Sequence, residues 1–467
     1  MMIKMNIHYT IKFWGRKDPA LFEQMLDDKY TKIIDPFCGS GTTGYVSVLK
    51  GCSALLSDIN PVSIFISENL LNKIYLNQNI IKEVEKILNE IQKRCYKVNS
   101  GILQEAVYIT YYKCPNCEEL VNPLSKKKSR LVCSCGKKFA QREAKDVVDK
   151  VIKVKIKEGN KIKEVNPKDY IKEDISIEAW YPKKKFEYEH NKPFNNLPNF
   201  GKRIDQIFFP RGLKAAAETY EFIESIDDEK IKDFLKLVFI ASLYSATKMI
   251  PNSITSGSSW KIPRYWTPPI KIERNFIQTF LRRLKYLNKL KRVWYEYVKD
   301  YEIFVDYFGN VKVGNNKYLS IVRCDARELE PPEVYDIAIM DPPHYGEILY
   351  YEMTYLWQCW LYGKKKDKRF KDFRFWEKEI DVNLKLGRDL EYYNEELVKI
   401  IKKYMNYSQK IFLILYNSNE EQFKTTLKLL KQKWNVEVKT VEVKVPSSAQ
   451  GIHGKRKKYL YLLKIKN

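Results

Sequence analysis

At 467 residues the chain exceeds one ordinary domain, and its 44% apolar content is enough to build buried cores, which excludes wholesale disorder. Its 83 Lys and Arg residues outnumber 58 Asp and Glu residues, and the net charge of +25 favours a polyanionic partner, above all nucleic acid. No apolar run approaches the roughly 18 residues that cross a bilayer, and residues 1–9 lack a signal-peptide core. We therefore expect a soluble, cytoplasmic protein without a membrane partner, whose nine cysteines are metal ligands or buried thiols rather than disulfides.

The first part of the chain has the pattern of a parallel α/β unit. Residues 32–34 form an apolar run that leads into Asp35, and Thr42–Leu49 has the character of a short helix. A second apolar run at residues 54–56 leads into Asp58. This order of strand, glycine-rich loop, helix and strand is the start of a βαβ fold.

The α/β texture is lost in the middle of the chain and returns near its end. The middle holds a cysteine-rich segment, a lysine-rich stretch and amphipathic helical patterns. After it, we predict strands at 319–322, 337–340 and 411–415, helices at 395–407 and 422–430, and an antiparallel pair at 436–445 and 459–465.

These sequence patterns predict one α/β domain, a Rossmann-like sheet, that is interrupted in sequence by a long insert. We assign residues 1–90 and 316–467 to the two halves of the sheet domain and residues 91–315 to the insert. Within the insert we expect a metal-binding ribbon at about 108–142 and a helical region at about 205–300.

The glycine-rich loop at residues 35–44 reads Asp-Pro-Phe-Cys-Gly-Ser-Gly-Thr-Thr-Gly. It lacks the Gly-Lys-Ser/Thr of a phosphate loop, and an acid at the end of a strand suits a cationic or hydroxylated ligand. Asp58 lies 23 positions after Asp35, where an acid that binds ribose is expected in nucleotide-binding folds.

This loop resembles the S-adenosylmethionine loop of the amino-group DNA methyltransferases. Residues 57–61, Ser-Asp-Ile-Asn-Pro, look like the second motif of that family, and residues 12–17, Lys-Phe-Trp-Gly-Arg-Lys, are similar to its segment near the methionine end of the cofactor. The resemblance covers about residues 11–71 and 320–466, under half the chain. It implies S-adenosylmethionine as cofactor, held by Lys12, Asp35, Phe37, Gly39, Gly41, Asp58 and Asp325.

A second motif, Asp341-Pro342-Pro343-His344, follows the apolar run at 337–340. It is similar to the catalytic D/N/S-P-P-aromatic motif of the same family, and Asp325 precedes it where that family's third motif carries an acid. A carboxylate and a neighbouring carbonyl, here Asp341 and Pro342, can accept hydrogen bonds from an exocyclic amine, and the two prolines stiffen the turn. The amine nitrogen then attacks the methyl group directly.

The motif departs from the family at its fourth position, where His344 replaces the usual Tyr or Phe and Tyr345 follows. Either ring is a candidate to stack on a base that has left the duplex. The resemblance therefore implies a catalytic set of Asp341, Pro342, Pro343, His344 and Tyr345.

Four cysteines in the insert form two pairs, Cys114 with Cys117 and Cys133 with Cys135. Two pairs at this separation are typical of a zinc ribbon with four cysteine ligands, although the second pair has one intervening residue instead of two. Four thiolates fill the coordination sphere, so we expect a structural zinc ion.

The order of motifs, with the cofactor segment first and the catalytic motif after a long insert, is similar to the α-ordered methyltransferases, which recognise their target between the two halves. We expect a DNA adenine-N6 methyltransferase, because Asp rather than Ser opens the catalytic motif. A cytosine-N4 enzyme, a guanine-N2 RNA methyltransferase and an inactive nucleic-acid-binding protein are the alternatives. Residues 258–266, which mix aromatic and basic side chains, are a candidate segment for contacting an extruded base.

Overall fold

The structure is a computed structural model that describes residues 7–127, 130–170, 175–186, 203–252, 265, 267–345, 348–417, 420–443 and 458–466. The chain divides into two compact units. Unit 1 comprises Met1–Tyr75, Leu287–Tyr362 and Lys366–Asn467, and unit 2 comprises Leu76–Tyr286 with Gly363–Lys365. Among the described residues, no helix is both long and apolar enough to span a membrane.

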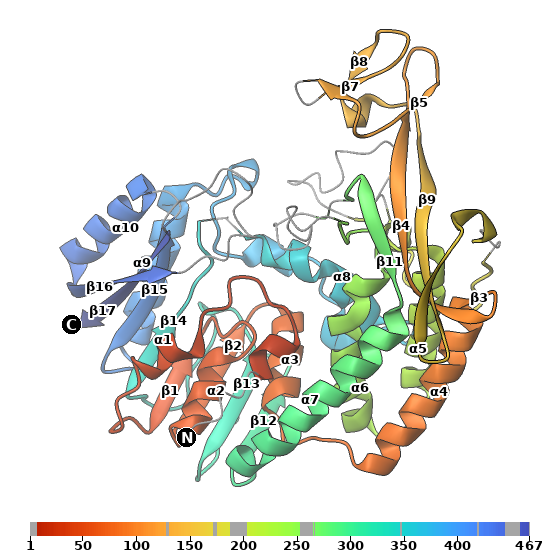
Figure 1. Cartoon of the computed structure of the whole chain (residues 1–467). Helices are drawn as coiled ribbons and strands as arrows, with labels where there is room; N and C mark the ends of the chain where they lie inside the picture. The colour runs from red at the N-terminus through yellow and green to blue at the C-terminus, as the bar shows by residue number, and fades with distance from the viewer. Residues whose placement is uncertain are drawn as a thin grey trace. The chain divides into compact units, whose positions relative to one another are not determined.

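Unit 1 is built on an eight-stranded sheet with the strand order β12-β13-β2-β1-β14-β15-β17-β16 (Figure 1). The first six strands pair in parallel and the last two pair antiparallel. The strands, in sheet order, are Glu302–Asp306, Tyr318–Arg323, Ser53–Asp58, Lys32–Asp35, Ile337–Met340, Ile411–Asn417, Lys458–Lys466 and Asn435–Val443.

The order reverses between β1 and β14, and this reversal positions the functional site. The chain passes from β1 to β2 on one side, whereas β14 pairs with β1 on the other. In sheets of this kind the ligand binds outside the carboxyl ends of the strands at the reversal. Asp35 ends β1 and Asp341 directly follows β14, so the topology brings the two predicted motifs to the same edge.

Helices cover both faces of this sheet because its strands are apolar on both sides. On one face, Leu55 and Ala338 join a buried cluster with α9 (Leu390–Tyr404) and α10 (Glu420–Lys433). On the other, Leu56 meets α2 (Thr42–Leu49) so closely that a Cβ on Gly44 would lie 2.4 Å from it. The remaining helices of unit 1 are α1 (Pro19–Glu23), α3 (Pro61–Leu71), α8 (Tyr350–Tyr362) and the end of α7 (Phe276–Val298).

Unit 2 combines helices with antiparallel strands. A six-stranded sheet has β4 (Gly101–Lys113) and β9 (Val147–Glu158) at its centre and a small sheet, β6-β7-β8, belongs to the cysteine-rich segment (Figure 1). The other elements are α4 (Gln78–Tyr96), β3 (Lys97–Val98), β5 (Leu120–Val121), β6 (Lys126–Lys127), β7 (Arg130–Val132), β8 (Lys138–Phe139), β10 (Lys161–Val165), α5 (Pro210–Glu224), α6 (Glu229–Ser242) and β11 (Ile270–Arg274).

The mixed α/β architecture predicted from the sequence is confirmed, and the break in the sheet falls between β2 and β13. The compact units differ from the predicted boundaries at residues 90 and 315, since α4 belongs to unit 2 and β12 extends the sheet of unit 1. The central sheet of unit 2 was missed. Lysines alternate with Val and Ile along β9, and this period of two was interpreted only as a basic stretch.

Candidate active site

The glycine-rich loop holds Asp35 at the end of β1 through two hydrogen bonds. The backbone N–H of Phe37 donates to one carboxylate oxygen at 2.8 Å, and the Thr43 hydroxyl donates to the other. Burial raises the pKa of Asp35 to about 7, and these two donors oppose the shift. Asp35 is therefore fixed in place by its own loop at the pocket edge.

Asp58 at the end of β2 is tied to the same loop. The backbone N–H of Gly39 donates to its Oδ2 at 3.0 Å, and that of Asn60 donates to Oδ1 at 2.8 Å. Burial raises the pKa of Asp58 to about 6. Gly39 has a φ of 52°, and a Cβ there would lie 3.2 Å from the Phe13 ring, so glycine allows both the turn and the close approach.

Asp325 follows β13 and lines the same pocket. Its carboxylate forms a two-point ion pair with Arg327, with Nε to Oδ1 at 3.0 Å and a terminal nitrogen to Oδ2 at 2.6 Å. Arg327 also binds Glu396 of α9 at 2.7 Å. The loop that carries Asp325 is thus fastened to a helix of unit 1.

Asp341 forms an ion pair with Lys17. The Lys17 ammonium lies 2.9 and 3.0 Å from the two carboxylate oxygens, and His344 Nε2 lies 2.8 Å from the same ammonium. Burial raises the pKa of Asp341 above its ordinary value, and the charge and hydrogen bonds of Lys17 oppose that shift. The carboxylate at the head of the catalytic motif therefore has a fixed cation beside it.

One pocket in unit 1 brings most of the predicted residues together. Asp35 and Asp341, 306 positions apart in the sequence, both line it. The other predicted residues in its lining are Phe37, Gly39, Asp58, Asp325 and Pro343.

Five predicted residues do not line this pocket: Lys12, Gly41, Pro342, His344 and Tyr345. Lys12 is exposed, and its ammonium lies 5.1 Å from the centre of the Trp14 ring. Gly41 precedes α2 with a φ of 82°, so its contribution is to the turn. Pro342 and His344 are buried beside Asp341.

Tyr345 points into the core of unit 1. Its hydroxyl donates to Thr426 at 3.1 Å, its ring lies 5.0 Å from that of Tyr393, and it is a member of the cluster that includes Leu397 and Leu415. His344 occupies a different environment, between Lys17 and the ring of Tyr416 at 5.7 Å. The two adjacent rings therefore have separate surroundings.

Sequence reasoning missed Lys17 and Glu379, which both line the pocket. Lys17 belongs to the segment at residues 12–17, whose other end, Lys12, was selected instead. Glu379 follows a short 3-10 helix, Phe375–Lys378, and burial followed by the neighbouring Asp381 raises its pKa well above the ordinary value. No motif marks Glu379, so the sequence carried no signal for it.

Comparison with known proteins gives two matches. A family model described as D12 class N6 adenine-specific DNA methyltransferase matches residues 19–221. The chain is 20% identical over 432 residues to the Type II methyltransferase M.MjaII of Methanocaldococcus jannaschii, an alignment that covers 88% of this chain and 72% of that protein. Both matches support adenine-N6 methylation of DNA as the activity of this chain. No solved structure matches it.

The predicted activity, S-adenosylmethionine-dependent methylation of DNA with adenine preferred as the base, is thereby confirmed. The family match includes the glycine-rich loop and Asp58 and extends into unit 2. Residues 258–264 and 266 of the segment proposed to contact an extruded base lie outside the described residues.

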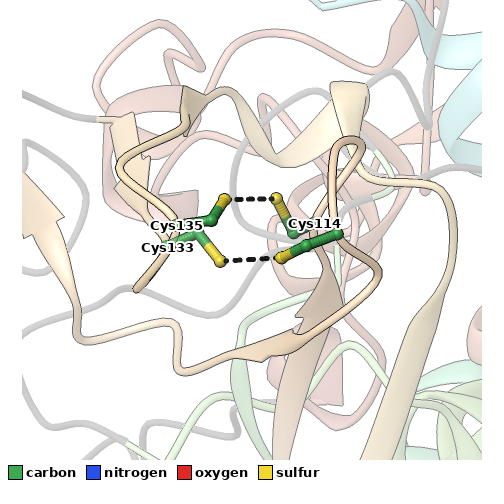
Figure 2. Close-up of side chains that lie close together, drawn as sticks. Cys114, Cys133 and Cys135 are labelled. Carbon is green, nitrogen blue, oxygen red and sulfur yellow. Dashed lines mark hydrogen bonds between the residues drawn. The ribbon is translucent and has the colours of Figure 1, made fainter.

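The four predicted cysteine ligands lie together in unit 2, with all four sulfur atoms within 4.8 Å of one another. Sγ of Cys114 lies 3.8 Å from that of Cys135, and Sγ of Cys117 lies 3.5 Å from that of Cys133 (Figure 2). The two pairs thus face each other across one small space, as ligands of a single metal ion do.

Proposed function

We propose that Asp341 and the carbonyl of Pro342 accept the two N–H groups of an adenine amine while Asp35, Asp58 and Asp325 hold the cofactor. The observation that carries this assignment is the pocket that Asp35 and Asp341 line together at the reversal of the sheet. Topology accounts for that shared position, because the carboxyl ends of neighbouring parallel strands meet at one edge.

The residues of the pocket fit S-adenosylmethionine. Carboxylates suit the hydroxyl and cationic groups of this molecule, and Gly39 leaves room where a side chain would strike Phe13. Asp58 sits where a ribose-binding acid is expected, and Asp325 is the candidate for the adenine ring. When bound, S-adenosylmethionine supplies a methyl group carried on a positively charged sulfur.

The chemistry assigned to the chain itself is orientation and proton acceptance. Hydrogen bonds from the amine to Asp341 and Pro342 localise its nitrogen lone pair, which is otherwise delocalised into the base. Bound S-adenosylmethionine would supply the methyl group to this nitrogen, and its sulfur would keep the electron pair of the broken carbon–sulfur bond. The nitrogen then loses one proton, which Asp341 is placed to accept.

We assign a structural zinc ion to the four cysteines. Zinc–sulfur bonds of about 2.3 Å in a tetrahedron place the sulfur atoms about 3.8 Å apart. The Cys114–Cys135 and Cys117–Cys133 sulfur separations are close to this value. Four protein ligands leave no open position for catalysis. Unit 2, which contains this site, is the candidate region for target recognition in DNA.

The test of the catalytic assignment is transfer of tritium from labelled S-adenosylmethionine to DNA. We expect Asp341→Ala to abolish labelling while calorimetry still detects cofactor binding, because Asp35 and Asp58 are intact. Asp27→Ala, which removes an exposed carboxylate of unit 1, is the matched control and should label DNA like the unaltered enzyme. Labelling that persists in Asp341→Ala would refute the role given to this carboxylate.

A further inference from the structure

All three ammonium protons of Lys17 have acceptors. One acceptor is the carbonyl of Gly15 at 2.8 Å, one is the Asp341 carboxylate at 2.9 Å, and one is His344 Nε2 at 2.8 Å. The Lys17 side chain is only 11% exposed, so these contacts form largely out of water. A single, largely buried cation therefore links the first and fourth residues of the catalytic motif.

The chemistry of Lys17 decides the state of His344. A charged ammonium has no lone pair, so Nε2 must be the acceptor and the single ring proton must be on Nδ1. Burial, followed by the charge of Lys17, lowers the pKa of His344 well below its ordinary value, in agreement with a neutral ring. Nε2 also lies 3.3 Å from Asp341 Oδ1, and the Lys17 ammonium bridges these two acceptors.

Arg16, which precedes Lys17, is bonded to the glycine-rich loop. Arg16 donates from Nε to the Ser40 hydroxyl at 2.8 Å and from a terminal nitrogen to the Ile11 carbonyl at 2.8 Å. Gly15 has a φ of 73°, and a Cβ there would lie 2.1 Å from the Tyr350 hydroxyl. These contacts constrain residues 15 and 16, and the Lys17 ammonium is therefore held in place.

We propose that Lys17 is a positioning residue for methyl transfer, which keeps the Asp341 carboxylate ionised in its buried site and holds His344 as a neutral acceptor. This role rests on the proposed function of Asp341. It assigns His344 to the support of Lys17 rather than to stacking on the base.

Burial and the charge of Lys17 act on the protonation of Asp341 in opposite directions. Burial favours the protonated form of Asp341, which has lost an acceptor site for the amine, and the Lys17 cation opposes this. Among the described residues, the neighbours His344, Asp35 and Tyr393 supply no replacement charge, since His344 is neutral and Asp35 and Tyr393 are not cations. Removal of the Lys17 charge should therefore shift the protonation of Asp341 to higher pH.

The experiment measures the single-turnover rate of tritium transfer between pH 5 and pH 9 with saturating cofactor and DNA. The variants are Lys17→Met, Lys17→Gln, which keeps hydrogen-bond donors without charge, and Lys17→Arg, which keeps the charge. Lys29→Met, an exposed lysine of unit 1, is the control. Asp35 titrates in every variant, so only differences between variants are interpreted.

We expect the acid limb of the rate profile to move upward by about one to two pH units in Lys17→Met and Lys17→Gln, and the rate to recover at high pH. The profile of Lys17→Arg should stay near that of the unaltered enzyme, and Lys29→Met should superimpose on it. If Lys17→Met does not fold, Lys17→Gln carries the same comparison.

If the transfer rate falls equally at every pH and Lys17→Arg is no faster than Lys17→Met, Lys17 has only a structural role. Superimposed profiles would also overturn the proposal. In both cases Asp341→Ala still tests the proposed function independently, whereas labelling by Asp341→Ala would overturn both ideas together.

Discussion

At the scale of single residues, the adjacent His344 and Tyr345 show how one position changes a side chain's role. Both were candidates to stack on a base, but Tyr345 lies in the core with its hydroxyl on Thr426, and His344 lies against Lys17. The φ of 45° at Tyr345 turns the chain between these two directions. Neighbouring residues in a turn can therefore serve separate purposes.

We predict that Tyr345→Phe lowers the free energy of unfolding by about 1 kcal/mol, because it removes one buried hydrogen bond. The methylation rate should be unchanged, since the ring remains in the core. Urea unfolding and tritium transfer measure the two effects. Thr426→Val removes the same bond from the other side, and the double variant should lose less than the sum of the two. A large loss of methylation with unaltered stability would instead support a role for Tyr345 in contacting the base.

At the scale of elements, α3 connects the cofactor pocket to α7. Its first turn is capped by the side chain of Asn60, which lines the pocket. At its other end, the buried ammonium of Lys291 donates to the carbonyls of Asn69, Leu70 and Asn72. A cation at this end satisfies carbonyls that the helix leaves free and complements its dipole.

Lys291→Met should lower the free energy of unfolding by about 3 kcal/mol or more, because several buried carbonyls lose their donor together. Lys289→Met removes an exposed lysine from the same helix and should have little effect. Urea unfolding followed by circular dichroism compares the two. Equal stability of both variants would contradict the capping role.

At the scale of the whole molecule, the pocket and the cysteine cluster lie in different units. Every residue that lines the cofactor pocket belongs to unit 1, whereas all four clustered cysteines belong to unit 2. Unit 1 is assembled from three stretches of the chain, and Asp35 and Asp341 come from two different stretches.

We predict that purified protein contains about one zinc ion per chain and that Cys133→Ser lowers this content sharply. Cofactor binding by calorimetry should persist in Cys133→Ser, because the pocket contains none of these cysteines. Cys52→Ser, which changes a buried cysteine outside the cluster, should keep its zinc. Zinc content measured by atomic emission decides the matter, and equal content in all three proteins would refute the assignment.

Local patterns in the sequence determined much of the catalytic unit. The glycine-rich loop, Asp58 and Asp341 each lie within or directly after a short apolar strand, and strand and loop chemistry depend on neighbours only a few positions away. For the same reason, Ile337–Met340 and Thr42–Leu49 were placed with their correct bounds. The spacing of the cysteines likewise predicted their cluster.

The tertiary structure determined which residues distant in sequence contact each other and which adjacent residues have separate surroundings. Lys17 and Asp341 are 324 positions apart, and nothing in either segment encodes their contact, since it depends on the pairing of β1 with β14. Glu379 reaches the pocket from an irregular segment without a pattern to read. Burial and charge at the site depend on packing. The sequence therefore identifies the acidic residues, whereas the fold determines their pKa values.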